Sequence, residues 1–141
     1  MSIVDAFDSS EEKLNKSHIH NLIRLALADG ILEESELERI RKIARSLGVT
    51  AEETNELLAS PEKISFNAPS GKEERLDRFV NLVRVVIADG AITEPEEKLL
   101  RRISIGLSLS EEKLPLYINT TTSMLKDGAA KDEIVEALMK L

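Results

Sequence analysis

The chain has 141 residues, of which 42% are apolar and 32% are charged, and its net charge is −7 at pH 7. This acidic balance, without a conspicuous cluster of Lys and Arg, argues against unaided binding of nucleic acid. The absence of cysteine excludes disulfides, thiolate metal sites and a cysteine nucleophile.

The composition favours an all-α fold. Leu, Ile, Ala, Glu and Lys are abundant, whereas only three Phe, one Tyr and no Trp are present. The length suits one domain, which we expect to span residues 1–141. No uninterrupted apolar run reaches about eighteen residues and no basic segment precedes an apolar one, so we expect a cytoplasmic protein that does not insert into a membrane.

Three helices are predicted in the first half of the chain. A helix capped by Ser10 or the serine before it runs toward Asp29, and a second, amphipathic helix ends at Gly48. Thr50 begins a third helix through the spacing of a capping box. These helices form repeat one, at about residues 10–59.

The second half repeats this plan after a connection at residues 60–69. Ser70 and Glu73 have the spacing of a capping box and predict the start of a long apolar helix. Thr93 starts the next helix, which has a proline in its first turn. Repeat two therefore covers about residues 70–125.

Two further patterns complete the predicted fold. Pro115 should shorten or bend the helix that follows Ser110, and an amphipathic stretch after Gly128 predicts a C-terminal helix at about residues 130–141. The run 79–87 is rich in β-branched residues, but its counterpart in repeat one indicates a helix. We therefore predict a single compact bundle of about seven helices, built from two pseudo-symmetric helix-turn-helix repeats.

The repeat is visible in the sequence itself. Residues 21–52 align with residues 81–112 without a gap, and twelve of the thirty-two aligned residues are identical. The shared residues include an Asn, an Arg, an Ala-Asp-Gly turn and two Glu. We expect function at this duplicated acidic turn.

The Asp of each turn lies where a carboxylate is electrostatically unfavourable. Asp29 and Asp89 fall in the last turn of a helix, whose unpaired carbonyls repel an anion by roughly 0.3–1 kcal/mol. A bound cation, an Arg or turn amides would offset this cost. Because Glu36 and Glu96 follow seven residues later, each can face the preceding Asp across the turn. The predicted metal ligands are therefore Asp29, Glu36, Asp89 and Glu96, with Glu34 and Glu94 as possible helpers.

Ligands that are all carboxylates favour Ca²⁺ or Mg²⁺. The pattern matches only the second half of an EF-hand loop, because Leu25 and Leu27 stand where the first oxygen ligands would be. Since Ca²⁺ takes about six to eight oxygens, one turn alone would give a weak site. We therefore predict that the two turns pool their four acids.

Several of these residues also have a structural interpretation. Glu36 and Glu96 occupy the position of a capping-box acid, which would give them a purely structural role. The repeated Arg24 and Arg84 lie on another helix face and are more typical of salt bridges. His18 and the histidine two residues later point about 200° apart on a helix, so we expect ordinary surface or partly buried histidines that share no metal.

The doubled Ala-Asp-Gly turn followed by Glu, with the Ile-Ala-x-x-Leu-Gly-Val helix end at residues 43–49, resembles the tellurite-resistance TerB family. The TerB-like fold also occurs in DjlA-type co-chaperones. The resemblance covers about residues 17–125. It implies a compact bundle of two related halves, with an acidic cluster at the four predicted ligands that binds divalent metal. It also implies a bacterial stress response and association with a membrane-bound partner.

We expect no enzyme, because the sequence shows no nucleophile–base pairing and no phosphate-binding glycine loop. The favoured hypothesis is a non-enzymatic TerB-like protein of tellurite resistance or stress response that binds Ca²⁺ or Mg²⁺ at its repeated turns. The alternative is an interaction adaptor whose acidic face docks a basic or membrane-associated protein partner without metal.

Overall fold

The computed structural model describes residues 10–28, 30, 32–60, 68–87 and 92–141. Within these ranges the chain forms seven helices and no strand, which confirms the predicted all-α fold. None of these helices is both long enough and apolar enough to cross a membrane. The helices are α2 (Ser10–Ala26), α3 (Glu34–Ser46), α4 (Ala51–Ala59), α5 (Lys72–Val86), α6 (Glu94–Gly106), α7 (Leu114–Lys126) and α8 (Lys131–Met139).

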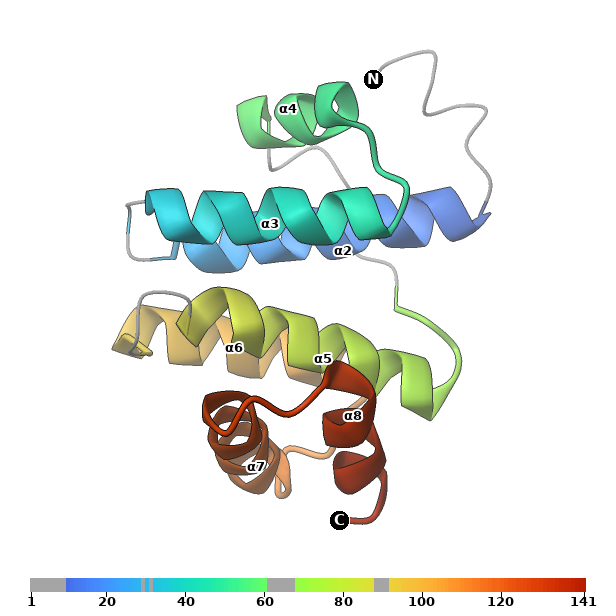
Figure 1. Cartoon of the computed structure of the whole chain (residues 1–141), viewed down its shortest axis with the longest axis vertical. Coiled ribbons are helices and arrows are strands. Elements are labelled where there is room, and N and C mark those ends of the chain that lie inside the picture. The colour runs from blue at the N-terminus through green and yellow to red at the C-terminus, as the bar shows by residue number, and fades with distance from the viewer. Residues whose placement is uncertain (1–9, 29, 31, 61–67, 88–91) are drawn as a thin grey trace.

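Two antiparallel helix pairs, α2 with α3 and α5 with α6, form the middle of the molecule (Figure 1). Helix α4 packs against α2 and α3 on one side, whereas α7 and α8 pack against α5 on the other. The C-terminal ends of α2 and α5 lie at the same end of the molecule as the N-terminal ends of α3 and α6 (Figure 1). The helix ends that flank the two predicted acidic turns are therefore on one side.

Helix α5 is the central element of the fold. It packs against α2, α3, α6, α7 and α8, and Phe79, Val83 and Val86 are fully buried. The β-branched run that would suit a strand is helical because packing on several faces outweighs a small difference in intrinsic preference. The buried apolar side chains of the described residues join one core cluster, to which both helix pairs contribute.

Most predicted helix ends are confirmed. Thr50 and Thr93 are the N-caps of α4 and α6, and each hydroxyl accepts a hydrogen bond from the backbone N–H of the glutamate three residues later. Gly30 and Gly48 have φ angles of +87° and +76°. This left-handed conformation is easily adopted by glycine and rarely by other residues, which explains why the preceding helices end there.

Two helix starts differ from the prediction. The capping box expected at Ser70 and Glu73 is wrong, because Gly71 is the N-cap of α5 and no side chain caps it. The segment before α5 is held instead by Arg75, which donates a hydrogen bond to the Ser70 carbonyl oxygen at 2.6 Å. Pro115 lies in the first turn of α7, so it begins that helix and does not bend it.

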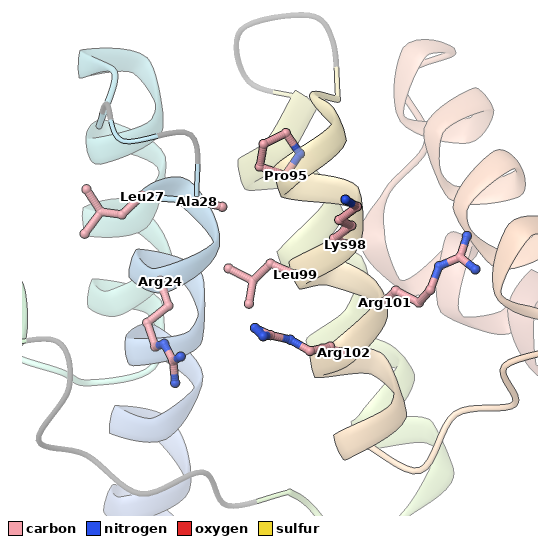
Figure 2. A pocket seen from close by; sticks show the side chains of 8 residues that line it. All are labelled: Arg24, Leu27, Ala28, Pro95, Lys98, Leu99, Arg101 and Arg102. Atoms are coloured by element: carbon pink, nitrogen blue, oxygen red, sulfur yellow. The ribbon is translucent and has the colours of Figure 1, made fainter.

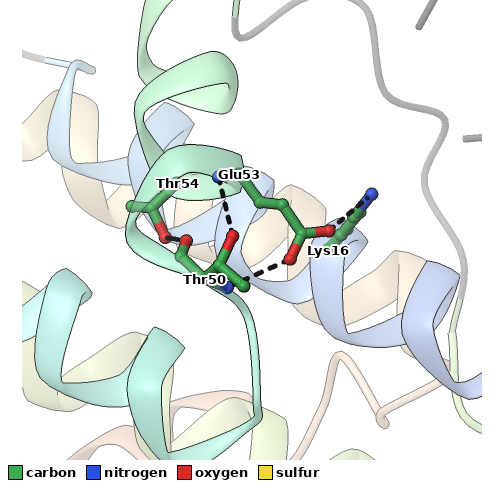
Figure 3. A network of polar contacts seen from close by, with 4 residues as sticks. All are labelled: Lys16, Thr50, Glu53 and Thr54. Atoms are coloured by element: carbon green, nitrogen blue, oxygen red, sulfur yellow. Dashed lines mark hydrogen bonds and ion pairs between the residues drawn. The ribbon is translucent and has the colours of Figure 1, made fainter. Parts of the chain in front are cut away.

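A partly buried ion pair joins α4 to α2 (Figure 3). Lys16 Nζ lies 2.9 Å from Glu53 Oε2, and only 7% of the lysine side chain is exposed. Burial alone would raise the pKa of Glu53, but the hydrogen bonds from Lys16 and Thr50 outweigh it and lower the pKa below its usual value. Thr54 adds a hydrogen bond from its hydroxyl to the Thr50 carbonyl oxygen at 2.9 Å.

Candidate functional site

The four predicted metal ligands fall into two pairs. Asp29 and Asp89 lie outside the described residues. Glu36 and Glu96 lie in the first turns of α3 and α6, and both are buried, with 0% and 1% of their surface exposed. Because a carboxylate is rarely buried without a partner, each of these positions calls for a physical explanation.

Helix capping is part of that explanation. Glu36 Oε1 accepts a hydrogen bond from the Glu33 backbone N–H at 3.1 Å. Glu96 Oε1 accepts hydrogen bonds from the backbone N–H and the hydroxyl of Thr93, at 3.0 and 2.8 Å. The capping interpretation is therefore confirmed for one oxygen of each carboxylate. For Glu96, the second oxygen still requires an explanation.

The second oxygen of Glu96 lacks a hydrogen-bond partner within the described part of the chain. Its Oε2 is buried and accepts no hydrogen bond there. An unsatisfied buried polar group costs about 1–3 kcal/mol, and a charged one costs more. A hydrogen-bond donor or a cation at this oxygen would remove that cost. The start of α6, directly after the second Asp-Gly turn, is therefore the strongest candidate for a ligand-binding position.

The two proposed helpers face solvent. Glu34 and Glu94 are exposed, and the Glu94 carboxylate lies 3.5 Å from Lys98 Nζ in an ion pair that is itself largely exposed. Such a pair contributes little to stability. No three His, Asp or Glu side chains among the described residues lie close enough to hold a metal. Since both aspartates are outside that set, the pooled four-acid site stays a prediction.

A basic groove, which the sequence interpretation missed, lies between α2 and α6 (Figure 2). Arg24 comes from α2, whereas Lys98, Arg101 and Arg102 come from α6. The sequence did contain a signal for it. Arg101 and Arg102 follow Lys98 by three and four residues, and residues at these spacings lie on one face of a helix. We call this surface the basic groove.

The repeated arginines differ in their surroundings. Arg24 is exposed and has no ion pair in the part of the chain that the structure describes, so the salt bridge predicted for it is not found there. Arg84 is partly buried, and burial together with the nearby charge of Arg39 lowers its pKa from the usual value. Arg101 pairs with Glu97 at 3.3 Å, as expected of a helix-surface arginine.

Both histidines are more deeply buried than the sequence suggested. His18 and His20 are 4% and 2% exposed, because α3, α4, α5 and α6 all pack against α2. His18 Nε2 lies 3.2 Å from Asn81 Nδ2 in α5. Close by, Arg78 donates a hydrogen bond to Asn15 Oδ1 at 2.9 Å. These polar contacts join α2 to α5 inside the bundle.

The buried position of His18 predicts a loss of stability in mild acid. Burial, with the charges of Arg78 and Lys131, holds the pKa of His18 well below its usual value. Below about pH 6.5 the unfolded chain binds a proton that the folded chain does not. The free energy of unfolding should therefore fall by up to about 1.4 kcal/mol per pH unit as the pH decreases.

Urea unfolding of the unchanged protein and of His18→Gln, followed at several pH values between about 7.5 and 5, measures this contribution. The variant should lose less stability on acidification than the unchanged protein. Identical pH dependence in the two proteins would show that His18 contributes nothing to it.

The fold and the site together define an all-helical protein with buried capping carboxylates at the starts of α3 and α6. Comparisons with protein-family models, with curated proteins and with solved structures found no match for this chain.

Proposed function

We propose that the protein is a non-enzymatic helical module that binds a divalent cation, Ca²⁺ or Mg²⁺, at its two Asp-Gly turns. The observation that carries this proposal is Glu96, a buried carboxylate whose Oε2 accepts no hydrogen bond within the described residues. Hard cations bind carboxylate oxygens. A cation at Oε2 would remove the cost of burying that oxygen unpaired.

In this proposal the other ligands come from the turns. Asp89 precedes Glu96 by seven residues, and an equal interval separates Asp29 from Glu36. The helix ends that flank both turns lie at one end of the molecule, which supports a site that pools the four acids (Figure 1). We propose that Glu34 and Glu94, two exposed acids at the same helix starts, assist in binding the cation.

We also propose that the two helix pairs are copies of one unit. Helices α3 (Glu34–Ser46) and α6 (Glu94–Gly106) begin and end sixty residues apart, and so do the last residues of α2 and α5. Glu36 and Glu96 are buried at equivalent positions and make equivalent capping bonds. These equivalences support two pseudo-symmetric repeats.

The TerB likeness supplies a cellular context for the module. We propose a role in bacterial tellurite resistance or stress response in the cytoplasm, together with a membrane-associated protein partner. Metal, and not tellurite, would occupy the acidic turns, because carboxylates repel an oxyanion.

Thermal melting with and without millimolar Ca²⁺ tests the proposal. We expect Ca²⁺ to raise the Tm, by about 4 °C for each kcal/mol of binding stabilisation. The double variant Asp29→Asn with Asp89→Asn should lose most of this shift, because each amide removes a negative ligand.

Asp127→Asn is the matched control for this experiment. Asp127 also precedes a glycine at the end of a helix, but Ile134 stands seven residues later where the repeats have Glu. The control should keep the full Ca²⁺ shift. Equal shifts in the double variant and the unchanged protein would remove the cation proposal.

The alternative is an adaptor that binds a basic protein segment without metal. It is favoured by the exposed acids at the two helix starts, Glu33 and Glu34 at α3 and Glu94 at α6. Two results together would support the adaptor over the cation module. The protein should bind the same partner with and without a chelator, and the double variant Glu34→Lys with Glu94→Lys should no longer bind it.

A further inference from the structure

The basic groove has a volume of about 920 Å³ and gathers four cations on a chain whose net charge is −7. Arg24 and Arg102 have no ion pair in the described part of the molecule. Among the described residues, Lys98 and Arg101 pair with acids one turn earlier on their own helix, in exposed contacts that contribute little. Within that part of the chain, an incoming negative group can therefore pair with these four cations at low cost.

The lining between these cations is apolar. Leu27 and Leu99 are partly buried and pack against the core, and Ala28 and Pro95 complete the lining. Figure 2 shows Leu99 and Arg102 projecting from α6 toward α2, so that apolar and cationic side chains share the space between the helices.

An exposed apolar side chain extends this surface along α6. Ile105 stands seven residues after Lys98, which places it on the same face of the helix, and it is 47% exposed. From Pro95 to Ile105 the helix rises about 15 Å, the length of about three helical turns. The surface is thus long enough to contact a short segment of another protein.

We infer that the basic groove binds an acidic peptide segment of a partner protein, one that carries apolar side chains between its Asp and Glu residues. Charge complementarity selects the acids, since like-charged segments are repelled and opposite charges are guided to the site. Leu27 and Leu99 form an apolar floor in the groove. This floor favours a segment with apolar side chains, as in grooves that accept one face of an amphipathic helix.

A peptide fits this groove better than a nucleic acid or an anionic membrane. Both of those present many phosphates over a wide area. The four cations can contact only a few of these phosphates, and the net charge of −7 repels the rest. A short acidic peptide brings only a few charges, and it also uses the apolar floor. This inference goes beyond the cation module, because the surface has the opposite sign and needs no metal.

Selection from a random peptide library displayed on phage, with the full chain immobilised in the presence of EDTA, tests the inference. We expect the enriched peptides to combine several Asp or Glu with apolar residues spaced by three or four positions. One enriched peptide, labelled with fluorescein, is then titrated with the protein and followed by fluorescence anisotropy.

The decisive comparison uses two double variants with the same change in net charge. Arg24→Glu with Arg102→Glu should weaken binding of the peptide at least about tenfold, because it reverses two cations of the groove. Lys42→Glu with Lys126→Glu alters exposed lysines of α3 and α7 outside the groove and should leave binding unchanged. Far-UV circular dichroism and thermal melting confirm that both variants are folded.

Enriched peptides without acidic bias, or equal weakening by the two double variants, would overturn the inference. So would binding to phosphatidylglycerol vesicles or to single-stranded RNA that is lost in Arg24→Glu with Arg102→Glu while no peptide is enriched. Replacing the apolar residues of the labelled peptide by serine should also weaken binding. If it does not, the apolar floor has no part in recognition and the inferred amphipathic partner is wrong.

Discussion

Replacing Phe79 with alanine is expected to lower the free energy of unfolding by about 3–5 kcal/mol. Phe79 is fully buried in α5, and its ring centroid lies 6.1 Å from that of Tyr117 in α7. Truncation removes this ring contact and leaves a cavity beside a helix that packs against α2, α3, α6, α7 and α8. Since a typical domain has about 5–15 kcal/mol of stability, the variant would be close to unfolding.

Urea unfolding followed by far-UV circular dichroism measures the effect. Leu116→Ala in α7 is the control, because this leucine is 49% exposed and its loss should change stability by only about 0.5 kcal/mol. A loss below about 1 kcal/mol for Phe79→Ala would contradict the central position of α5 in the core.

In Glu96→Gln, we expect stabilisation by Ca²⁺ to disappear while stability without metal is retained. Glutamine keeps an oxygen that can accept the hydrogen bond from the Thr93 backbone N–H, but it removes the charge that attracts a hard cation. It also removes the cost of a buried negative oxygen. At a Ca²⁺ concentration about one hundred times the Kd, the stabilisation at stake is about 2.7 kcal/mol.

Unfolding by urea in EDTA and again in excess Ca²⁺ separates the two roles of Glu96. Glu97→Gln is the control, because Glu97 is an exposed neighbour that pairs with Arg101 on the helix surface, and it should keep the Ca²⁺ response. If Glu96→Gln loses the same stability in both solutions, Glu96 serves as a cap alone.

The helices could be predicted because their signals are local. Thr50 and Thr93 cap their helices by accepting hydrogen bonds from residues three positions later in the chain. Gly30 and Gly48 adopt the left-handed conformation that ends a helix. Gly71 was missed because it caps α5 without a side-chain bond, and the neighbouring Ser70 offered the more familiar capping pattern.

Features that depend on distant contacts were harder to predict. The burial of His18 results from the packing of α5 against α2, and its partner Asn81 lies sixty-three residues away. The basic groove combines Arg24 with cations of α6, so only the fold brings them together, although the spacing of Lys98, Arg101 and Arg102 was readable.

The candidate site was predicted in part. The sequence indicated Glu36 and Glu96, with helix capping as one of two possible roles. In the structure both side chains are buried and make capping hydrogen bonds. Local spacing is enough to suggest such a capping bond. It does not reveal that Glu96 Oε2 is buried without a hydrogen-bond partner in the described structure, since that depends on the packing around α6.

The most direct test of the cation module is a Ca²⁺ titration of isotope-labelled protein, followed residue by residue by NMR. We predict saturable shifts centred on the amides of the two turns, around Gly30 and Gly90, and their loss in Asp29→Asn with Asp89→Asn. Shifts that do not saturate, that spread evenly over the acidic surface, or that survive the double substitution unchanged would contradict cation binding at the duplicated turns.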